Sequence, residues 1–291
     1  MLAEVAAVDL SLVKVFEGHT DALAILSELD GPDPKPGSLW GTWCAEPPDA
    51  RLLIHGAGTG SVRLNGRKAW CSGAAEVTHA IVSGWNDEGL PWLAAVALQQ
   101  PGVTVTGDGW PAVGMARSGS VDVRFDDAQA MPVGKPGDYV ARPGFWHGGA
   151  GIAACWFGGA LGIGRAVRKR CASTSDAHRL AHLGAIDVAL ATCAALLREV
   201  AQWIDANPTS DAQAMTLAAR LAAEDTAHTV LRHAGRALGA GPLCRDETLS
   251  RAVADLPIYL RQSHAERDLE SLGRLAGKAS ARPEDERGWA L

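Results

Sequence analysis

The chain has 291 residues, of which 47% are hydrophobic and 21% are charged. This composition is ordinary for a globular protein and excludes an intrinsically disordered one. Its 27 basic and 33 acidic residues give a net charge of −6, and the sequence pI is about 5.8. That balance argues against a nucleic-acid-binding protein, whose affinity comes largely from contacts with phosphates. The length is sufficient for two domains with substantial hydrophobic cores.

The six cysteines show neither a Cys-x-x-Cys pair nor the ligand spacings of zinc sites. We expect them to be buried free thiols of a cytoplasmic protein. The first residues lack the basic and apolar regions of a signal peptide. Residues 148–164 carry no charged side chain, but seven of them are glycine and the run is shorter than the roughly 20 residues that span a bilayer. We therefore expect no membrane span.

Residues 1–37 predict a short helical segment followed by a linker. Apolar residues from 1 to about 29 recur at roughly helical spacing. Three prolines and two glycines at 31–37 then end helix formation, because proline cannot continue a helix.

Residues 38–142 predict a β-domain. The dipeptide Asn65-Gly66, between two apolar runs, predicts a tight hairpin turn. Short strands with glycines between them predict an antiparallel β-barrel or sandwich. The glycine-rich segment 56–61 is followed by another strand, so it does not match a dinucleotide-binding loop, which must open a helix. The β-branched or alternating runs are residues 51–55, 61–64, 78–82 and 120–125.

Residues 143–277 are rich in alanine and predict an up-down four-helix bundle, which makes the whole chain α+β. Capping residues at 173–176, a turn at 207–211 and the stop at 239–242 divide the region. Gly158 and Gly162 in the first helix predict the close approach of another backbone. No metal site is predicted, because the histidines do not form the paired motifs of a bundle metal centre. Residues 278–291 are expected to be a polar tail. The predicted helices are about 148–172, 176–206, 211–238 and 246–275.

Several segments, in order along the chain, resemble the acyl-CoA dehydrogenase family. Residues 41–47 (Gly-Thr-Trp-Cys-Ala-Glu-Pro), 64–74, 78–82 and 114–127 resemble its middle domain, and residues 258–268 (Ile-Tyr-Leu-Arg-Gln-Ser-His-Ala-Glu-Arg-Asp) resemble the end of its C-terminal bundle. The resemblance covers roughly residues 8–275 and implies the family's fold with a shortened N-terminal helical domain.

The resemblance also implies an FAD site. In the family, the Glu-Pro strand and the Lys-x-Trp-x-Ser segment flank the flavin. Trp70 is then expected to pack on the isoalloxazine ring, and Ser72 to hydrogen-bond near its reactive nitrogen. The turn at Gly239 and Gly241 resembles the glycine turn that meets the FAD of a neighbouring subunit. The implied cofactor-binding residues in the β-domain are Thr42, Trp43, Cys44, Ala45, Trp70, Cys71 and Ser72.

The activity implied is the FAD-dependent α,β-desaturation of an acyl thioester such as an acyl-CoA, in fatty-acid metabolism. This reaction needs a base that removes the α-proton. Ser263-His264 occupies the place where the family often carries its base glutamate, and Glu266 is the nearest carboxylate. Ser263, His264 and Glu266 are therefore the candidate catalytic residues. A homo-oligomer, or a hetero-oligomer with a related subunit, and an electron-transfer partner are also implied.

Two alternatives remain open. Flavin-dependent monooxygenases on the same fold lack the base glutamate and use Ser or His near the flavin, which suits Ser263-His264. The second alternative is a degenerate, non-catalytic subunit that pairs with a full-length relative. The shortened N-terminal helices and the absence of the family's Arg-x-x-Phe-Gly segment favour that interpretation.

Overall fold

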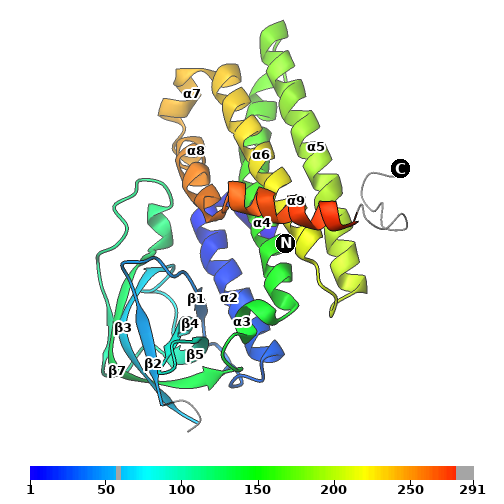
Figure 1. Ribbon diagram of the computed structural model, residues 1–291. Helices are drawn as coiled ribbons and strands as arrows, with labels where there is room; N and C mark the ends of the chain where they lie inside the picture. The colour runs from blue at the N-terminus through cyan, green and yellow to red at the C-terminus, as the bar shows by residue number, and fades with distance from the viewer. Residues whose placement is uncertain (57–59, 280–291) are drawn as a thin grey trace. The chain divides into compact units, whose positions relative to one another are not determined.

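The computed structural model describes residues 1–56 and 60–279 (Figure 1). The chain forms two compact units. Ser11–Phe145 make up the first, here called the β-unit, and Met1–Leu10 together with the residues from Trp146 onward make up the second, the helical unit. Part of the glycine-rich segment 56–61 and most of the expected polar tail lie outside the described residues.

Two helices occupy the N-terminal segment, where one stretch of helix was predicted. Helix α1 (Leu2–Val8) ends at Asp9, whose backbone is extended, and α2 (Leu10–Glu28) follows at once. The chain leaves α2 before the predicted proline-rich linker. A Cβ at Gly31 would lie 2.5 Å from a methyl group of Leu26, so a larger residue at this turn would displace the Leu26 side chain.

Among the described residues, seven strands form a single sheet that closes into a barrel, as the sequence predicted. Their order is β1-β4-β2-β3-β7-β5, β4 also pairs with β5, and β6 adds to β7. Most pairs are antiparallel, but β1 and β2 both run parallel to β4. The strands are β1 (Trp40–Trp43), β2 (Leu52–His55), β3 (Val62–Cys71), β4 (His79–Asn86), β5 (Pro91–Ala97), β6 (Val103–Val105) and β7 (Val121–Val133).

The predicted hairpin turn at Asn65-Gly66 is wrong. Strand β3 continues through both residues, and its pairing with β7 shifts register between Leu64 and Gly66. Gly66 has a φ of +122°, and a Cβ there would lie only 2.3 Å from the carbonyl oxygen of Arg51. The glycine therefore serves a β-bulge, in which the backbone of the neighbouring segment approaches closely.

The β-unit has two packed cores. Alternating side chains of the strands fill the barrel interior, among them Trp43, Ile54, Leu64 and Val123. Helix α2 closes the second core. It places Ala22, Ile25 and Leu26 against Trp40, Ile81, Leu93, Ala95 and Val133. The short helix α3 (Asp138–Ala141) follows the last strand.

The helical unit contains the predicted bundle, with one correction. The predicted fourth helix is broken: after α8 (Glu247–Tyr259) and a 3₁₀ turn at Leu260–Gln262, the chain leaves helical geometry before α9 (Glu266–Ala279). Ala265 has a φ of +46°, which no continuous helix permits. The other helices are α4 (Gly144–Cys171), α5 (Ala177–Ala206), α6 (Gln213–Leu238) and α7 (Ala240–Arg245).

The close backbone approach predicted at Gly158 and Gly162 is confirmed, and α1 is the element that approaches. A Cβ at Gly158 would lie 2.3 Å from the carbonyl oxygen of Ala3, and one at Gly162 would lie 2.5 Å from that of Ala7. The first helix of the chain therefore packs directly on the glycine-rich face of α4.

Two helices of the bundle, α4 and α5, are long and apolar enough to cross a membrane by length and composition alone. In α4, 56% of the apolar window is buried inside the protein, as in a core helix, but in α5 only 11% is. Leu180 and Val188 are among the exposed apolar side chains of α5. Much of the apolar surface of α5 is thus left uncovered by residues 1–56 and 60–279.

All six cysteines are free thiols. Four of them are buried and Cys44 is partly buried, but Cys244 is exposed. The expectation of buried thiols is therefore wrong for Cys244, which lies in the short exposed helix α7.

Candidate functional site

The β-unit residues expected to flank a flavin lie at the ends of β1 and β3. The Thr42 hydroxyl donates to the carbonyl oxygen of Gly18 in α2 at 2.7 Å. Trp43 is buried, and its indole N–H donates to the carbonyl oxygen of Ser72 at 3.0 Å. The side chains of Thr42 and Trp43 therefore hold the β-unit together, which leaves their backbone groups as the part a ligand would contact.

Cys44 and Ala45 follow β1 and keep part of their surface exposed. Burial raises the pKa of the Cys44 thiol to about 11, although the Lys68 ammonium acts in the opposite direction. The thiol is therefore protonated at neutral pH, which excludes Cys44 as a nucleophile because the thiolate is the reactive form.

Trp70 is exposed where its neighbours in β3 are buried. It lies in a second irregularity of the β3–β7 pairing, its φ is +59°, and 49% of its surface is accessible. A left-handed backbone at a non-glycine residue costs about 1–2 kcal/mol, and a bulge of this kind redirects a side chain out of the ladder. The fold thus leaves about half of the indole surface exposed, and such a surface can stack on a planar ligand.

The two residues after Trp70 differ in role: the Cys71 thiol is buried, whereas the Ser72 hydroxyl takes part in a hydrogen-bonded group. Cys71 is completely buried, its thiol contacts the carbonyl oxygen of Lys68, and burial raises its pKa, so it contributes packing only. The hydroxyl of Ser72 lies 2.8 Å from that of Ser120, which lies 2.7 Å from that of Ser118. These linked hydroxyls both donate and accept hydrogen bonds.

Ser118 and Ser120 were not among the predicted site residues. They do lie within the segment 114–127 that carried the family resemblance, and that position is the signal that pointed toward them. The contact of Ser120 with Ser72 extends the polar part of the candidate site from the end of β3 to the start of β7.

A buried ion pair fixes the loop after β1. The ammonium of Lys68, 1% exposed, contacts the carboxylate of Glu46 and lies 2.8 Å from the hydroxyl of Ser83. Glu46 also accepts from the indole N–H of Trp85 at 3.3 Å. Because a buried charge is stable only when paired, this cluster anchors the residue that follows Ala45.

These features fit the requirements of a flavin ring. A bound heterocycle needs an apolar wall and a few well-placed polar groups. In such a site the exposed indole of Trp70 would supply the wall, and the hydroxyl of Ser72 with the backbone after β1 would supply the polar groups.

In the helical unit, Ser263 and His264 lie in the non-helical connection before α9. The imidazole Nδ1 of His264 is 3.3 Å from one carboxylate oxygen of Asp268, and the His264 backbone N–H donates to the other at 3.2 Å. The Ser263 hydroxyl accepts from the N–H of Ala265. Glu266 is exposed in the first turn of α9. Of the three predicted catalytic residues, His264 is the one that a carboxylate orients.

Asp268 was not predicted as a site residue. Its separation of four from His264 is the signal for a local pair, but that signal assumes a helix. The actual contact depends on the break at Ala265, which periodicity does not predict.

The glycines predicted to meet a neighbouring subunit lie at the α6–α7 turn. Gly239 has a φ of +64°, and a Cβ at Gly239 or Gly241 would meet no described atom within 4 Å. The 13 residues of α8, about 20 Å of helix, separate this turn from His264. One copy of the chain therefore does not bring the two features together.

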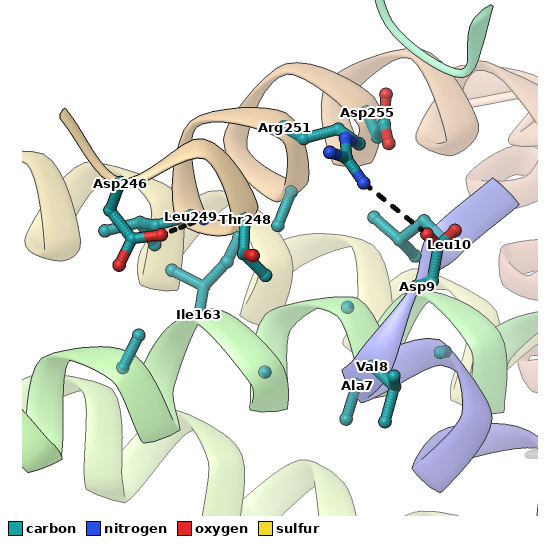
Figure 2. Close-up of a pocket in the computed structure, with 15 residues that line it drawn as sticks. Ala7, Val8, Asp9, Leu10, Ile163, Asp246, Thr248, Leu249, Arg251 and Asp255 are labelled. Atoms are coloured by element: carbon teal, nitrogen blue, oxygen red, sulfur yellow. Dashed lines mark hydrogen bonds and ion pairs between the residues drawn. The ribbon is translucent and has the colours of Figure 1, made fainter. Parts of the chain in front are cut away.

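The cavity drawn in Figure 2 is a separate feature of the helical unit. It lies among α1, the start of α2, α4 and α8, encloses about 100 Å³ and contains the ion pair of Asp9 with Arg251 at 3.8 Å. None of the predicted site residues lines it. Cofactor pockets usually enclose about 300–1,000 Å³, so this cavity is too small for a flavin.

No protein-family model matches the chain. A curated relative, the amino sugar nitrososynthase DnmZ of Streptomyces peucetius, is 43% identical over 105 residues, covering 32% of this chain and 26% of DnmZ. The match thus spans about a quarter of that relative's length.

Two solved structures are similar over most of the chain. TdsC of Paenibacillus sp. A11-2, in complex with FMN and indole, has a TM-score of 0.83 and 20% identity over 94% of this chain and 80% of TdsC. The chain has the acyl-CoA dehydrogenase-like fold. KijD3, in complex with FMN and dTDP-3-amino-2,3,6-trideoxy-4-keto-3-methyl-D-glucose, has a TM-score of 0.80 and 21% identity over 98% of this chain and 79% of KijD3. The predicted fold class is confirmed.

The predicted activity is wrong. The first prediction was desaturation of an acyl thioester, a reaction at a CH–CH bond that belongs to fatty-acid metabolism. The similarity to an amino sugar nitrososynthase overturns that prediction. It favours the alternative that the Ser263-His264 pair had left open, a flavin-dependent monooxygenase on the same fold.

Proposed function

We propose that this protein is a flavin-dependent monooxygenase that oxidises the amino group of a nucleotide-linked amino sugar. The observation that carries the proposal is the 43% identity with DnmZ. The fold adds support, because KijD3 combines the same architecture with FMN and a dTDP-linked amino sugar.

We propose FMN as the flavin in place of the FAD that the family resemblance implied, because the similar TdsC and KijD3 structures contain FMN. When bound, reduced flavin supplies the two electrons with which one atom of O₂ becomes water while the other is inserted into an N–H bond of the substrate. The amine, O₂ and reduced flavin thus give a hydroxylamine, water and oxidised flavin. A second round would carry the nitrogen to the nitroso level with loss of a further water.

The residues of the chain would hold and deprotonate the reactants. The indole of Trp70 would cover one face of the flavin ring, and the Ser72 hydroxyl would hydrogen-bond its edge. His264 would accept the proton that a sugar ammonium must lose before its nitrogen lone pair can react. An imidazole whose Nδ1 is held by a carboxylate leaves Nε2 available for this role.

Two kinds of protein partner belong to this proposal. A reductase that supplies reduced flavin takes the place of the electron-transfer partner predicted from the sequence. A second copy of the chain would cover the outer face of α5, where Leu180 and Val188 are joined by the exposed small residues Ala181, Gly184 and Ala191. Burial of such an apolar face is the usual driving force of subunit association.

Oxygen consumption coupled to product mass tests the function. The purified protein, FMN, a flavin reductase with its nicotinamide donor and a dTDP-linked 3-amino sugar should consume oxygen and yield an oxidised sugar. The hydroxylamine is heavier than the substrate by one oxygen atom, and the nitroso product has one more oxygen atom and two fewer hydrogen atoms than the substrate. The same sugar with a hydroxyl in place of the amine is the control. Failure of the amine to yield an oxidised product would contradict the proposal. Flavin binding that appears only in the presence of a related subunit would favour the degenerate-subunit alternative instead.

A further inference from the structure

We propose that Asp268 is a positioning residue that fixes both the orientation and the tautomer of His264, so that the Nε2 atom of His264 is the proton acceptor. This inference rests on the function proposed above, and it adds a residue that the sequence analysis did not select. It is carried by the geometry of the connection between α8 and α9.

The two carboxylate oxygens of Asp268 have different partners. One accepts the backbone N–H of His264 at 3.2 Å, and the other lies 3.3 Å from the imidazole Nδ1. A carboxylate accepts hydrogen bonds and does not donate them, so Nδ1 must be the atom that carries hydrogen. In the neutral ring the lone pair is then on Nε2.

Asp268 is itself held in place from the rest of the bundle. It is 7% exposed and lies 4.0 Å from the guanidinium of Arg220 in α6. Arg220 also donates to the carbonyl oxygen of Gln262 at 2.9 Å, and its guanidinium lies 4.7 Å from the ring centre of the buried Trp156. Arg220 thus contacts both the Asp268 carboxylate and the backbone segment that leads into His264, and it holds the two in place.

The imidazole of His264 is exposed, in contrast to the Asp268 carboxylate that it contacts. The His264 side chain is 62% exposed, whereas that of Asp268 is 10% exposed. Because Nδ1 of this exposed imidazole contacts a buried and well-positioned carboxylate, Nε2 is the ring nitrogen that remains accessible to a bound substrate.

A capping role is the competing explanation of the same contacts. Asp268 lies in the first turn of α9 and accepts a backbone N–H, as capping carboxylates do. Asp268→Asn separates the two roles. The amide oxygen can still accept the backbone N–H, but the amide NH₂ can donate to Nδ1, which moves the imidazole hydrogen to Nε2 and removes the acceptor.

The experiment compares the wild type, Asp268→Asn and the control Glu270→Gln. Glu270 lies on the same helix, is exposed, and pairs with Arg274 instead of His264. NMR of protein with isotope-labelled histidine, at a pH where the imidazoles are neutral, reports which ring nitrogen carries hydrogen. The spectrum of His264→Gln identifies the signal of interest among the nine histidines.

We expect hydrogen on Nδ1 in the wild type and in Glu270→Gln, and on Nε2 in Asp268→Asn. Turnover of the amino sugar by Asp268→Asn should fall by roughly 100-fold in kcat, the scale of general-base catalysis, with KM little changed and thermal stability retained. Hydrogen on Nε2 in the wild type, an unchanged tautomer in the variant, or wild-type turnover by the variant would each overturn the inference. Because the NMR comparison needs no substrate, it still tests the role of Asp268 if the wild type oxidises no amine.

Discussion

Trp43 and Ser72 are joined by a hydrogen bond of 3.0 Å from the indole N–H to the backbone carbonyl, which ties β1 to the residue after β3. Both segments are proposed to flank the flavin. The bond therefore sets the spacing of the two sides of the proposed site.

Trp43→Phe should loosen this link. We expect a loss of about 1–3 kcal/mol of unfolding free energy, because the variant leaves a carbonyl group unsatisfied, together with weaker FMN binding. Urea unfolding and fluorescence titration with FMN measure the two effects. Trp40→Phe is the matched control, since that buried indole donates to the Ser38 hydroxyl and packs in the core that α2 closes. Equal loss of FMN affinity in both variants would contradict the proposed arrangement.

Trp70→Ala should weaken FMN binding by about tenfold, or about 1.4 kcal/mol, while the stability of the flavin-free protein changes little. The indole is half exposed, and its left-handed backbone is unfavourable, so little folding energy depends on it. Isothermal titration with FMN and thermal unfolding give the two numbers. Met131→Ala, at 48% exposure on β7, should leave FMN affinity as it is.

Glu46→Gln should destabilise the β-unit by about 3–5 kcal/mol, because it leaves the buried Lys68 ammonium without its carboxylate. Lys68→Met should be less damaging, since Glu46 is 32% exposed and can turn to water. The double variant should recover part of the loss of Glu46→Gln. Chemical unfolding of the four proteins in a double-mutant cycle measures this coupling, and additive losses would show that the pair does not act as a unit.

Acid should weaken the helical unit through Asp246. Its carboxylate accepts the Leu249 N–H at the start of α8 and pairs with Arg170, and both contacts hold the pKa of Asp246 below its ordinary value of 3.8. A carboxylate whose pKa is lower in the folded state than in the unfolded state stabilises the fold fully above its unfolded-state pKa. This stabilisation is lost as the pH falls through the folded-state pKa. The unfolding midpoint of the wild type should therefore drop more steeply below pH 3.8 than that of Asp246→Asn. Asp225→Asn, at an exposed position of α6, is the control and should follow the wild type.

Val188→Asp should convert the proposed oligomer to monomers. The side chain is 67% exposed at the centre of the apolar face of α5, and a charge buried there would have no partner. Light scattering after size exclusion reports the mass. Val113→Asp, at 85% exposure in the β-unit, should leave the mass unchanged. A wild type that is monomeric at all concentrations would contradict the second-copy proposal.

The barrel, the bundle and the bounds of α5 and α6 follow from signals that act locally. Asp176 caps α5, and Gly239 ends α6, as residues of their kind do at helix ends. The hairpin at Asn65-Gly66 failed because the approach of Arg51, a long-range contact, decides how the glycine is used. The local sequence Asn65-Gly66 favours a turn, but the close approach of the Arg51 carbonyl favours a bulge in a continuous strand, and the bulge is what forms.

The candidate site was predictable only in part. The resemblance selected Trp70 and Ser72. It could not predict that Trp70 is exposed and Cys71 buried, because that difference depends on the irregularity in the β3–β7 pairing. The pairing of His264 with Asp268 depends on the break at Ala265, which no periodic pattern encodes. The order of the motifs was sufficient to predict the fold. The reaction depends on a few side chains, such as Trp70 and His264, whose irregular backbone cannot be predicted from a periodic pattern.

The packing of α1 on Gly158 and Gly162 has a consequence for the order in which the protein matures. Met1–Leu10 are synthesised before the roughly 135 residues of the β-unit, but they belong to a unit whose remaining members are synthesised after it. Helix α1 therefore cannot pack on α4 until the β-unit has been synthesised, and the barrel can fold before that contact forms. The helical unit is completed only after the β-unit.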